Sequence, residues 1–343
     1  GRTGQLGPEQ ECTIMKTFEW TDATSVEQAL GQLDQKAILK AGGVDVLDLL
    51  KEHLIAPDRL VNIRNIRELD YVRHDDQSGL KLGPLVTLHA LSEEPVVLKQ
   101  YTAIAHSAGH AATPQIRNMA TLGGNLVQRP RCWYFRNEEF HCRKKGGELC
   151  YAHHGENQYH SIFDNTPCAI VHPSSTATAL VAYHATIELT SSKGKKEVAL
   201  EDFFTLPEVD VHRENNLAPG QIITEIRVPA QPANSRSVYI KQGEKESQDW
   251  PIADVAVVME RDGDRCKNVS IVLGAAAPVP HRAKEAEDAV KGKKIDDKLA
   301  HDAARAALAD AEPLALNGYK VPLFETIIRR ALLACAGDEE ASS

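Results

Sequence analysis

The sequence has no apolar run near the roughly 20 residues that a membrane-spanning helix requires, so it predicts no transmembrane segment. Positive charge is not in excess either: 39 Lys and Arg face 48 Asp and Glu, which disfavours nucleic acid and membrane surfaces as partners. No charged-then-apolar signal opens the chain. The polar, glycine-rich residues 1–14 are expected to be a leader or a cloning remnant, and Cys12 there is expected to have no chemical role.

Both common nucleotide-binding motifs are missing, because no G-x-G-x-x-G and no lysine-containing P-loop occurs. Two other diglycine segments are present, at 41–45 (Ala-Gly-Gly-Val-Asp) and at 121–125 (Thr-Leu-Gly-Gly-Asn). The first follows a predicted strand at 37–39 and precedes a predicted helix that Asp45 can cap. Glycine lets a phosphate approach the backbone, and the first amides of a helix point at the anion. Each segment therefore predicts an anion cradle, with an ordinary turn as the alternative.

Cysteine is scarce, yet four of the seven cysteines fall within one stretch, with gaps of 9, 7 and 17 residues: Cys132, Cys142, Cys150 and Cys168. Four soft thiolates in one segment are typical of a metal site. Of the remaining three, Cys12 lies in the leader, and Cys266 and Cys335 are expected to be buried apolar residues. A disulfide framework is not expected in a chain of this size without an export signal.

The choice of metal rests on spacing and charge. Zinc sites usually contain close Cys-x2-4-Cys pairs, and the shortest gap here is 7 residues. A four-thiolate cubane is anionic, and six basic residues share the segment: Arg129, Arg131, Arg136, Arg143, Lys144 and Lys145. Such cations are expected to raise its reduction potential. The pattern favours a [4Fe-4S] cluster, with zinc or unligated thiols as alternatives. The nearby histidines 141, 153, 154, 160 and 172 are expected to be solvated or to lie beside the ligands.

Periodicity divides the chain into an α+β arrangement. Strands are expected at 37–39, 60–63, 80–82, 168–171 and 186–190, and helices at 26–33, 45–54, 96–112 and 176–183. Residues 130–167 lack periodicity, which is typical of a long functional or disordered loop. A Pro-rich linker near 229–235 precedes three strands, at 237–241, 253–260 and 269–273, and two helices, at 298–310 and 323–336.

Several motifs together resemble the FAD-binding medium subunit of the molybdenum hydroxylases, the xanthine dehydrogenase and carbon monoxide dehydrogenase group. They are the segment 41–45, Gln-Ile-Arg-Asn-Met-Ala-Thr-Leu-Gly-Gly-Asn-Leu at 115–126, His-Pro-Ser at 172–174, Tyr239-x-Lys241, and Leu273-Gly274 followed by Pro278, Pro280 and Arg282. The resemblance covers about residues 15–337. It implies a FAD-binding domain of two subdomains at 15–232, with a cluster insert at 129–168. A C-terminal domain at 233–338, of three antiparallel strands and a helical bundle, and a tail at 339–343 would follow.

The resemblance also implies the cofactor-binding residues. They are Ala41, Gly42, Gly43, Val44, Asp45, Val46, Thr113, Thr121, Gly124, Asn125, Ser174, Ser175 and Lys241. Two positions depart from the family pattern: Ser175 stands where an aspartate is common, and Val44 where threonine is frequent. A cysteine insert after Gly-Gly-Asn resembles two subtypes, the bacterial aldehyde oxidoreductases and 4-hydroxybenzoyl-CoA reductase, and the position of the last cysteine is closer to the aldehyde type.

The implied function is electron transfer, with no catalytic residue in this chain. A large subunit with molybdenum cofactor would oxidise the substrate, and a small subunit with [2Fe-2S] clusters would pass electrons to FAD. The external acceptor stays open among NAD, a quinone, ferredoxin and oxygen, and the substrate cannot be inferred. The compartment is expected to be cytoplasmic, or periplasmic if a partner carries an export signal. A scaffold subunit with zinc or a cluster and no flavin is the alternative of a different class.

Overall fold

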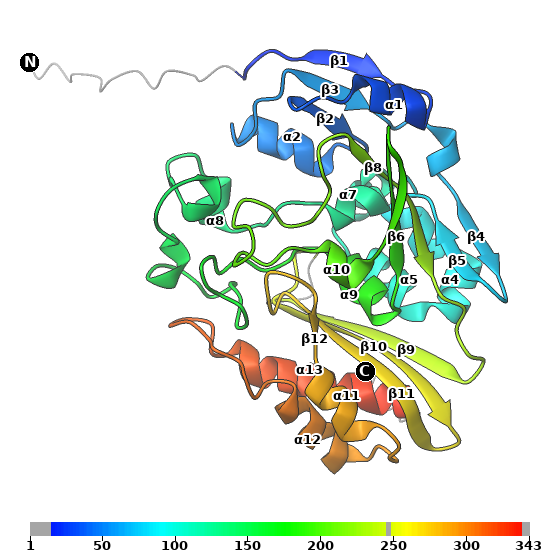
Figure 1. Cartoon of the computed structure of the whole chain (residues 1–343). Helices are drawn as coiled ribbons and strands as arrows, with labels where there is room; N and C mark the ends of the chain where they lie inside the picture. The colour runs from blue at the N-terminus through cyan, green and yellow to red at the C-terminus, as the bar shows by residue number, and fades with distance from the viewer. Residues whose placement is uncertain (1–14, 245–247, 338–343) are drawn as a thin grey trace, which may run out of the picture.

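The computed structural model describes residues 15–244 and 248–337, so the expectations for 1–14 and 339–343 lie outside the described residues. Three sheets follow one another through the molecule, and the cysteine insert, residues 129–168, lies to one side of them (Figure 1). The α+β class and the order of two subdomains and a C-terminal sheet with helices are confirmed. Across the described residues, no helix is both long and apolar enough to cross a membrane.

The first subdomain is a parallel three-stranded sheet with two helices. The strand order is β1-β3-β2, and the elements are β1 (Glu19–Asp22), α1 (Val26–Gln32), β2 (Ala37–Lys40), α2 (Val44–Lys51) and β3 (Arg59–Asn62). Ser25 caps α1 by accepting a hydrogen bond from the Gln28 amide, as its position before an apolar stripe predicts. In contrast, α2 begins at Val44 with Gly43 as N-cap, so the expected capping by Asp45 is wrong.

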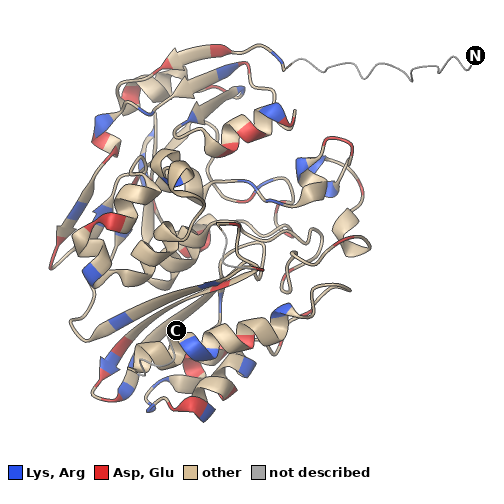
Figure 2. Cartoon of the chain, turned by 180° about the vertical axis from the view of Figure 1, so that it is seen from behind, with Lys and Arg blue, Asp and Glu red and all other residues tan. Residues whose placement is uncertain are grey.

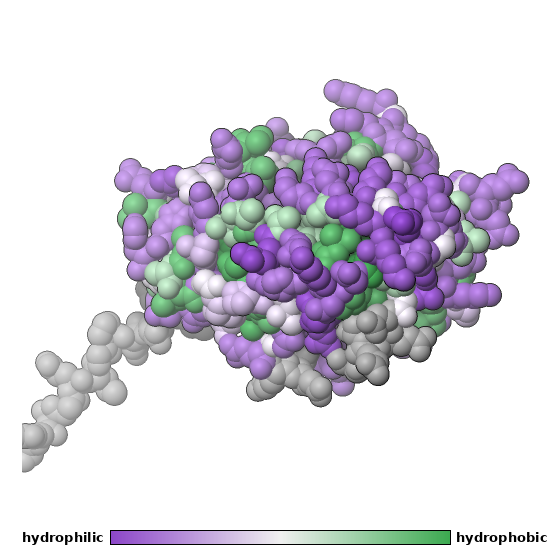
Figure 3. All heavy atoms as spheres, turned by 90° about the horizontal axis from the view of Figure 1, so that it is seen from below, coloured by the Kyte–Doolittle hydropathy of each residue, from purple (hydrophilic) through white to green (hydrophobic). Residues whose placement is uncertain are grey.

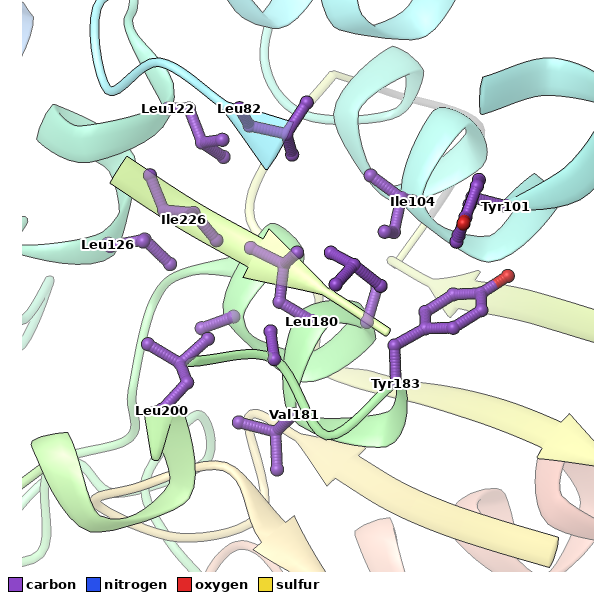
Figure 4. Close-up of a cluster of buried hydrophobic side chains, with 14 of the residues drawn as sticks. Leu82, Tyr101, Ile104, Leu122, Leu126, Leu180, Val181, Tyr183, Leu200 and Ile226 are labelled. Carbon is purple, nitrogen blue, oxygen red and sulfur yellow. The ribbon is translucent and has the colours of Figure 1, made fainter. Parts of the chain in front are cut away.

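The second subdomain is built on a five-stranded antiparallel sheet of order β4-β5-β8-β6-β7. Its strands are β4 (Val72–Asp75), β5 (Gly79–Leu82), β6 (Thr186–Ser191), β7 (Gly194–Ala199) and β8 (Gln221–Val228). Its helices are η1 (Arg67–Leu69), α3 (Leu88–Glu93), α4 (Pro95–Gln100), α5 (Thr102–Gly109), α6 (Pro114–Met119), α7 (Leu122–Leu126), α9 (Ser175–Ala182) and α10 (Leu200–Phe203). Side chains of α5, α7 and α9 meet those of β5 and β8 in the core (Figure 4).

Two sequence expectations for this subdomain are wrong. The helix expected at 96–112 is split at Tyr101, whose backbone leaves the helical region while its side chain is buried in the core. The strand expected at 168–171 forms no ladder. The carbonyl oxygen of Ala169 instead accepts from the Ser161 amide within the insert, and just after this segment the His172 amide donates to Ala277 of the C-terminal domain.

The C-terminal sheet has four antiparallel strands in the order β12-β11-β10-β9, one more than expected. Its elements are β9 (Ser235–Gln242), β10 (Ala253–Asp262), β11 (Arg265–Gly274), β12 (His281–Arg282), α11 (Lys284–Val290), α12 (Asp297–Ala306) and α13 (Lys320–Ala336). The extra strand has two residues, too few for a periodic pattern. The helices cover one face of the sheet, and Cys266 and Cys335 are buried between, as expected. Seen from below, this end of the molecule is largely hydrophilic around a few apolar side chains (Figure 3).

The cysteine insert contains three single turns and no strand: α8 (Trp133–Arg136), η2 (Arg143–Lys145) and η3 (Tyr151–His153). The lack of regular structure is therefore confirmed, but the segment is ordered by side chains. Phe135 and Cys142 pack with Leu49 of α2 in a small apolar cluster. At its other end, the amides of Ile162 and Phe163 donate to Ala276 in the loop between β11 and β12 of the C-terminal domain. The insert thus contacts both the first subdomain and the C-terminal domain.

Candidate functional site

A large cavity of about 1030 Å³ lies where the two subdomains and the C-terminal domain meet. Its volume is at the upper end of the range of cofactor and ligand sites. All of the predicted cofactor-binding residues except one line its wall: Ala41, Gly42, Gly43, Val44, Asp45, Val46, Thr113, Thr121, Gly124, Asn125, Ser175 and Lys241. The exception, Ser174, is buried and caps α9. Residues spread over 200 positions of sequence are thereby gathered around one space.

The start of α2 supplies an anion site in this wall. Gly43 has φ of +85°, a conformation that favours glycine, and no side chain caps the helix that follows. The first amides of a helix have no acceptor within the helix, and the helix dipole adds partial positive charge there. Because residues 41–46 line the cavity, these amides are available to a phosphate inside it.

Gly42 also has a packing role that the sequence did not predict. A Cβ built at this position would lie 2.0 Å from the carbonyl oxygen of Met119, which is backbone at the end of α6. The missing side chain therefore lets the β2–α2 turn pack against α6, and Arg64 donates to the same Met119 oxygen at 3.2 Å. Gly42 joins the two subdomains and so closes this side of the cavity.

The second diglycine segment is a short helix, α7, and not the turn that the sequence indicated. Thr121 caps it by accepting from the Gly124 amide at 3.3 Å. The side-chain oxygen of Asn125 accepts from the hydroxyls of Ser174 and Thr176, each at 2.6 Å. Since this oxygen is fully engaged, the amide NH2 of Asn125 is the group left for a ligand in the cavity.

Ser175 connects the cavity wall to a buried carboxylate. Its hydroxyl hydrogen-bonds the phenol of Tyr239, and that phenol donates to Asp254 at 2.8 Å. Thr178 donates to the other Asp254 oxygen at 3.2 Å. Burial raises the pKa of Asp254 to about 6, against the effect of these two hydrogen bonds. The acid that is common at position 175 in the family is thus absent, but a carboxylate lies two hydrogen bonds behind Ser175.

Lys241 and Thr113 complete the predicted set. The Lys241 ammonium donates to the carbonyl oxygen of His110 at 3.0 Å and also to that of Asp249. Burial lowers the pKa of Lys241, and the nearby Asp254 and Asp249 oppose that shift. Thr113 caps α6 through the Ile116 amide. Both side chains are held by local backbone and still line the cavity.

Several residues that line the large cavity were not predicted from the sequence. The segment 217–223 lines the cavity, and Pro219-Gly220 within it is a turn signal that could have drawn attention to it. Trp250 also lines it, with its ring 4.7 Å from the Arg131 guanidinium. No local pattern marks Trp250, because a single tryptophan in a loop carries no periodicity.

Asp45 fastens the cysteine insert to α2. One oxygen accepts from Arg131 at 2.8 Å and from Arg136 at 2.7 Å, and the other accepts from the Arg129 amide at 2.9 Å. Asp48, one turn further along α2, pairs with Arg136 at 2.9 Å. In Figure 2 basic residues of the insert lie beside acidic residues of α2, and the ion pairs of Asp45 and Asp48 join their side chains.

A second ion-pair group is buried on the other side of the insert. Glu214 accepts from Arg129 at 3.0 Å and from Lys144 at 2.7 Å. Burial alone would raise the pKa of Glu214, but the two cations outweigh it and lower the pKa. Four of the six basic residues therefore have carboxylate partners, which the sequence did not predict, and their expected effect on a cluster potential stays a prediction.

The four cysteines line one small cavity, the thiol cavity, together with Phe135, Lys144 and Tyr151 among others. Main-chain amides are aimed at three of the sulfurs. Those of Tyr134 and Phe135 donate to Cys132, those of Ala152 and Ala169 to Cys150, and that of Ile170 to Cys168. A neutral thiol is a weak acceptor, so such convergence is typical of sulfurs that carry negative charge.

The ionisation of these thiols differs from one to the next. Burial raises the pKa of Cys132 to about 12, against the two amides that donate to it. A hydrogen bond from Cys168 lowers the pKa of Cys150 to about 5, and the same bond with burial raises that of Cys168. All four are free thiols. Among the described residues, no three His, Cys, Asp or Glu side chains are arranged to hold a metal ion.

Comparison with known proteins identifies the class. Residues 16–231 match the family described as the FAD binding domain in molybdopterin dehydrogenase, and residues 238–335 match the CO dehydrogenase flavoprotein C-terminal domain. The chain belongs to this family, the FAD-binding subunits of molybdenum-dependent oxidoreductases.

Its relatives agree along almost their whole length. The chain is 30% identical to the aldehyde oxidoreductase FAD-binding subunit PaoB of Escherichia coli (strain K12), over 93% of this chain and 98% of that protein. It is 28% identical to the carbon monoxide dehydrogenase medium chain of Hydrogenophaga pseudoflava, over 94% and 98%. A solved structure of that carbon monoxide dehydrogenase superposes with a TM-score of 0.73 at 27% identity, over 94% and 98%. Quinoline 2-oxidoreductase from Pseudomonas putida 86, at 23% identity and a TM-score of 0.74, shares the fold.

Proposed function

We propose that this chain is an electron-transfer subunit that holds FAD in the large cavity and a [4Fe-4S] cluster in the thiol cavity. The observation that carries the proposal is the convergence of the predicted cofactor residues on one cavity of about 1030 Å³. The thiol cavity is next to α2, because Phe135 and Cys142 in its wall pack against Leu49 of that helix. Asp45 of the same helix lines the large cavity and pairs with Arg131 of the insert. The two family matches support a division into a FAD-binding domain at 15–232, with insert 129–168, and a C-terminal domain at 233–338.

In this account the first amides of α2, at residues 43–46, bind the diphosphate of FAD. The NH2 of Asn125 and the ammonium of Lys241 donate hydrogen bonds to the other polar groups of FAD. The Ser175 hydroxyl, held by its hydrogen bond to Tyr239, orients one of these polar groups. Ala41, Thr113, Thr121 and Gly124 complete the wall, and Ser174 acts from behind by fixing Asn125. FAD supplies one- and two-electron chemistry when bound, and the protein's part is to hold, orient and tune it.

Cys132, Cys142, Cys150 and Cys168 are the proposed cluster ligands. The amides directed at their sulfurs support anionic sulfur at this place. The spacing of the cysteines along the chain disfavours zinc, because zinc sites usually contain close Cys-x2-4-Cys pairs and the shortest gap here is 7 residues. A cubane binds its four thiolates through four different irons, so it does not need such pairs. The same reasoning makes a zinc scaffold without flavin the weaker alternative.

The partners follow from the relatives. We infer a complex with a molybdenum-cofactor large subunit and a [2Fe-2S] small subunit, from which electrons pass to FAD and then to an external acceptor. Of the two subtypes with a cysteine insert, the identity to an aldehyde oxidoreductase subunit supports the aldehyde type over 4-hydroxybenzoyl-CoA reductase. No residue of this chain is proposed to act on the substrate.

The variant Cys142→Ser tests the two cofactors separately. In protein purified anaerobically with its partners, we expect Cys142→Ser to lose the broad iron–sulfur absorption of this chain and to keep most of its FAD, because Cys142 does not line the large cavity. The matched control is Cys266→Ser, at a buried cysteine far from both cavities, which should keep both cofactors. If Cys142→Ser retained all of its iron, the cluster assignment would be wrong.

A further inference from the structure

His160 is the one histidine of the cysteine insert whose ring contacts a predicted ligand sulfur among the described residues. Its Nε2 lies 3.2 Å from the Sγ of Cys132, which is hydrogen-bond distance for sulfur. The ring is buried and packs edge-on against Trp133, 5.6 Å between centroids. The other ring nitrogen, Nδ1, is buried with no hydrogen-bond partner among the described residues.

The direction of this hydrogen bond follows from the chemistry of the ligand. A thiolate that binds iron carries no proton, so it can only accept. Nε2 must then be the protonated nitrogen, and a neutral imidazole leaves Nδ1 without a proton. In this tautomer no buried N–H is left without an acceptor, because the unpartnered Nδ1 carries no proton.

The C-terminal domain holds His160 in place. Asn317 and Lys320, both 0% exposed, each donate to the His160 carbonyl oxygen at 3.0 Å. Asn317 also donates to the Ser161 oxygen at 3.0 Å, and the His160 amide donates to Asn157. A carbonyl oxygen that accepts from two buried side chains is held more firmly than one in an exposed loop. Their effect is to fix the main chain from which the imidazole reaches Cys132.

We propose that His160 tunes the cluster through Cys132, by donating its Nε2–H to the sulfur, and that Asn317 and Lys320 position it from the C-terminal domain. This inference rests on the proposed [4Fe-4S] cluster. Hydrogen bonds to the sulfurs are among the factors that set the potential of such clusters. Reduction adds one electron and increases the negative charge on the sulfurs, while the Nε2 proton stays on the ring. The hydrogen bond therefore stabilises the reduced form more than the oxidised form.

The test is a redox titration of the cluster in the intact complex, followed by electron paramagnetic resonance. We expect His160→Phe to keep the cluster and to lower the equilibrium constant for its reduction roughly tenfold, which is about 59 mV for one electron. His160→Gln keeps an N–H donor and should recover much of the loss. Asn317→Ala, which changes no charge, should shift the potential in the same direction by less. His154→Phe, at an exposed histidine of the same insert, is the matched control and should leave the potential unchanged.

A second measurement reports on the hydrogen bond itself. In the reduced complex labelled with ¹⁵N-histidine, pulsed electron–nuclear methods should detect one weakly coupled labelled nitrogen, which both His160→Gln and His160→Phe remove, and one exchangeable proton, which only His160→Phe removes. A nitrogen coupled as strongly as a direct iron ligand would overturn the inference. So would an unchanged potential in His160→Phe with the cluster intact, which leaves the proposed function standing. A wild-type chain without iron would overturn both.

Discussion

His172 and Asp254 are buried titratable residues near the large cavity, and their pKa values move in opposite senses. Burial lowers the pKa of His172 to about 4, against the opposing charge of Glu214; its ring accepts from the Ser174 amide and packs against Phe204. Burial raises that of Asp254 to about 6. His172 therefore favours the folded state at neutral pH, and Asp254 favours it at acid pH.

The pH dependence of His172 can be isolated in a variant. The unfolded chain binds a proton here below pH 6.5 and the folded chain only below about pH 4, so the stabilising contribution is complete above pH 6.5 and is lost as the pH falls to 4. Between these values we expect the wild type to lose roughly 3 kcal/mol more unfolding free energy than His172→Gln. Urea unfolding at a series of pH values measures this difference, from which the Asp254 contribution cancels. Parallel curves for the two proteins would contradict it.

Gly42 has a packing role that the sequence did not predict. The sequence indicates a close approach to phosphate, which stays a prediction, and the structure adds that the backbone of Met119 lies against this glycine. A local pattern shows that a side chain is absent but not what occupies its place, because the neighbour comes from a segment nearly 80 residues away.

We expect Gly42→Ala to destabilise the protein by about 1–3 kcal/mol, because the new Cβ would force backbone at the end of α6 to move. FAD content should fall with it, since the same contact closes the cavity wall. Gly31→Ala is the matched control, because nothing lies within 4 Å of a Cβ at this position. Alanine within α1 should raise the free energy of unfolding by about 0.5–1 kcal/mol. Thermal unfolding and flavin content measure both, and a Gly42→Ala protein with normal stability would disprove the packing role.

At the scale of elements, the sequence predicted most strands and helices because each has its own apolar periodicity. The failures share another cause. Tyr101 breaks a helix to fill the core, Ala169 bonds to the Ser161 loop and not to a strand, and β12 pairs through two residues only. In each case tertiary contacts decide the local conformation, and no local signal carries them.

The connection between α2 and the cysteine insert is likewise invisible in sequence, because Asp45 and Arg136 lie 91 positions apart. We expect Asp45→Asn to reduce the free energy that holds the cysteine insert against α2 by roughly 2–3 kcal/mol, because the guanidinium groups of Arg131 and Arg136 then have a neutral partner. Alkylation of the cysteine insert thiols in the cofactor-free protein should then be faster. Asp48→Asn, at a side chain 49% exposed, should cost less than 1 kcal/mol and serves as control. Equal effects of the two variants would contradict the role of Asp45.

At the scale of the whole molecule, three parts of the chain enclose two adjacent cavities. The residues expected to bind the cofactor could be named because the family motifs carry them, and all but Ser174 line one cavity; their binding of FAD stays a prediction. The parts that could not be predicted are the segment 217–223, Trp250 and the carboxylates that pair with the basic residues of the insert. They depend on how the three parts dock, which no periodicity records.

The central claim is that one chain holds both FAD and a [4Fe-4S] cluster. The most direct measurement is the content of FAD, iron, acid-labile sulfide and zinc in the complex purified without oxygen, with the iron assigned to this chain by comparison with Cys142→Ser. The account predicts one FAD, and about four iron and four sulfide that the variant lacks. Stoichiometric zinc, or flavin with no iron lost in the variant, would contradict it.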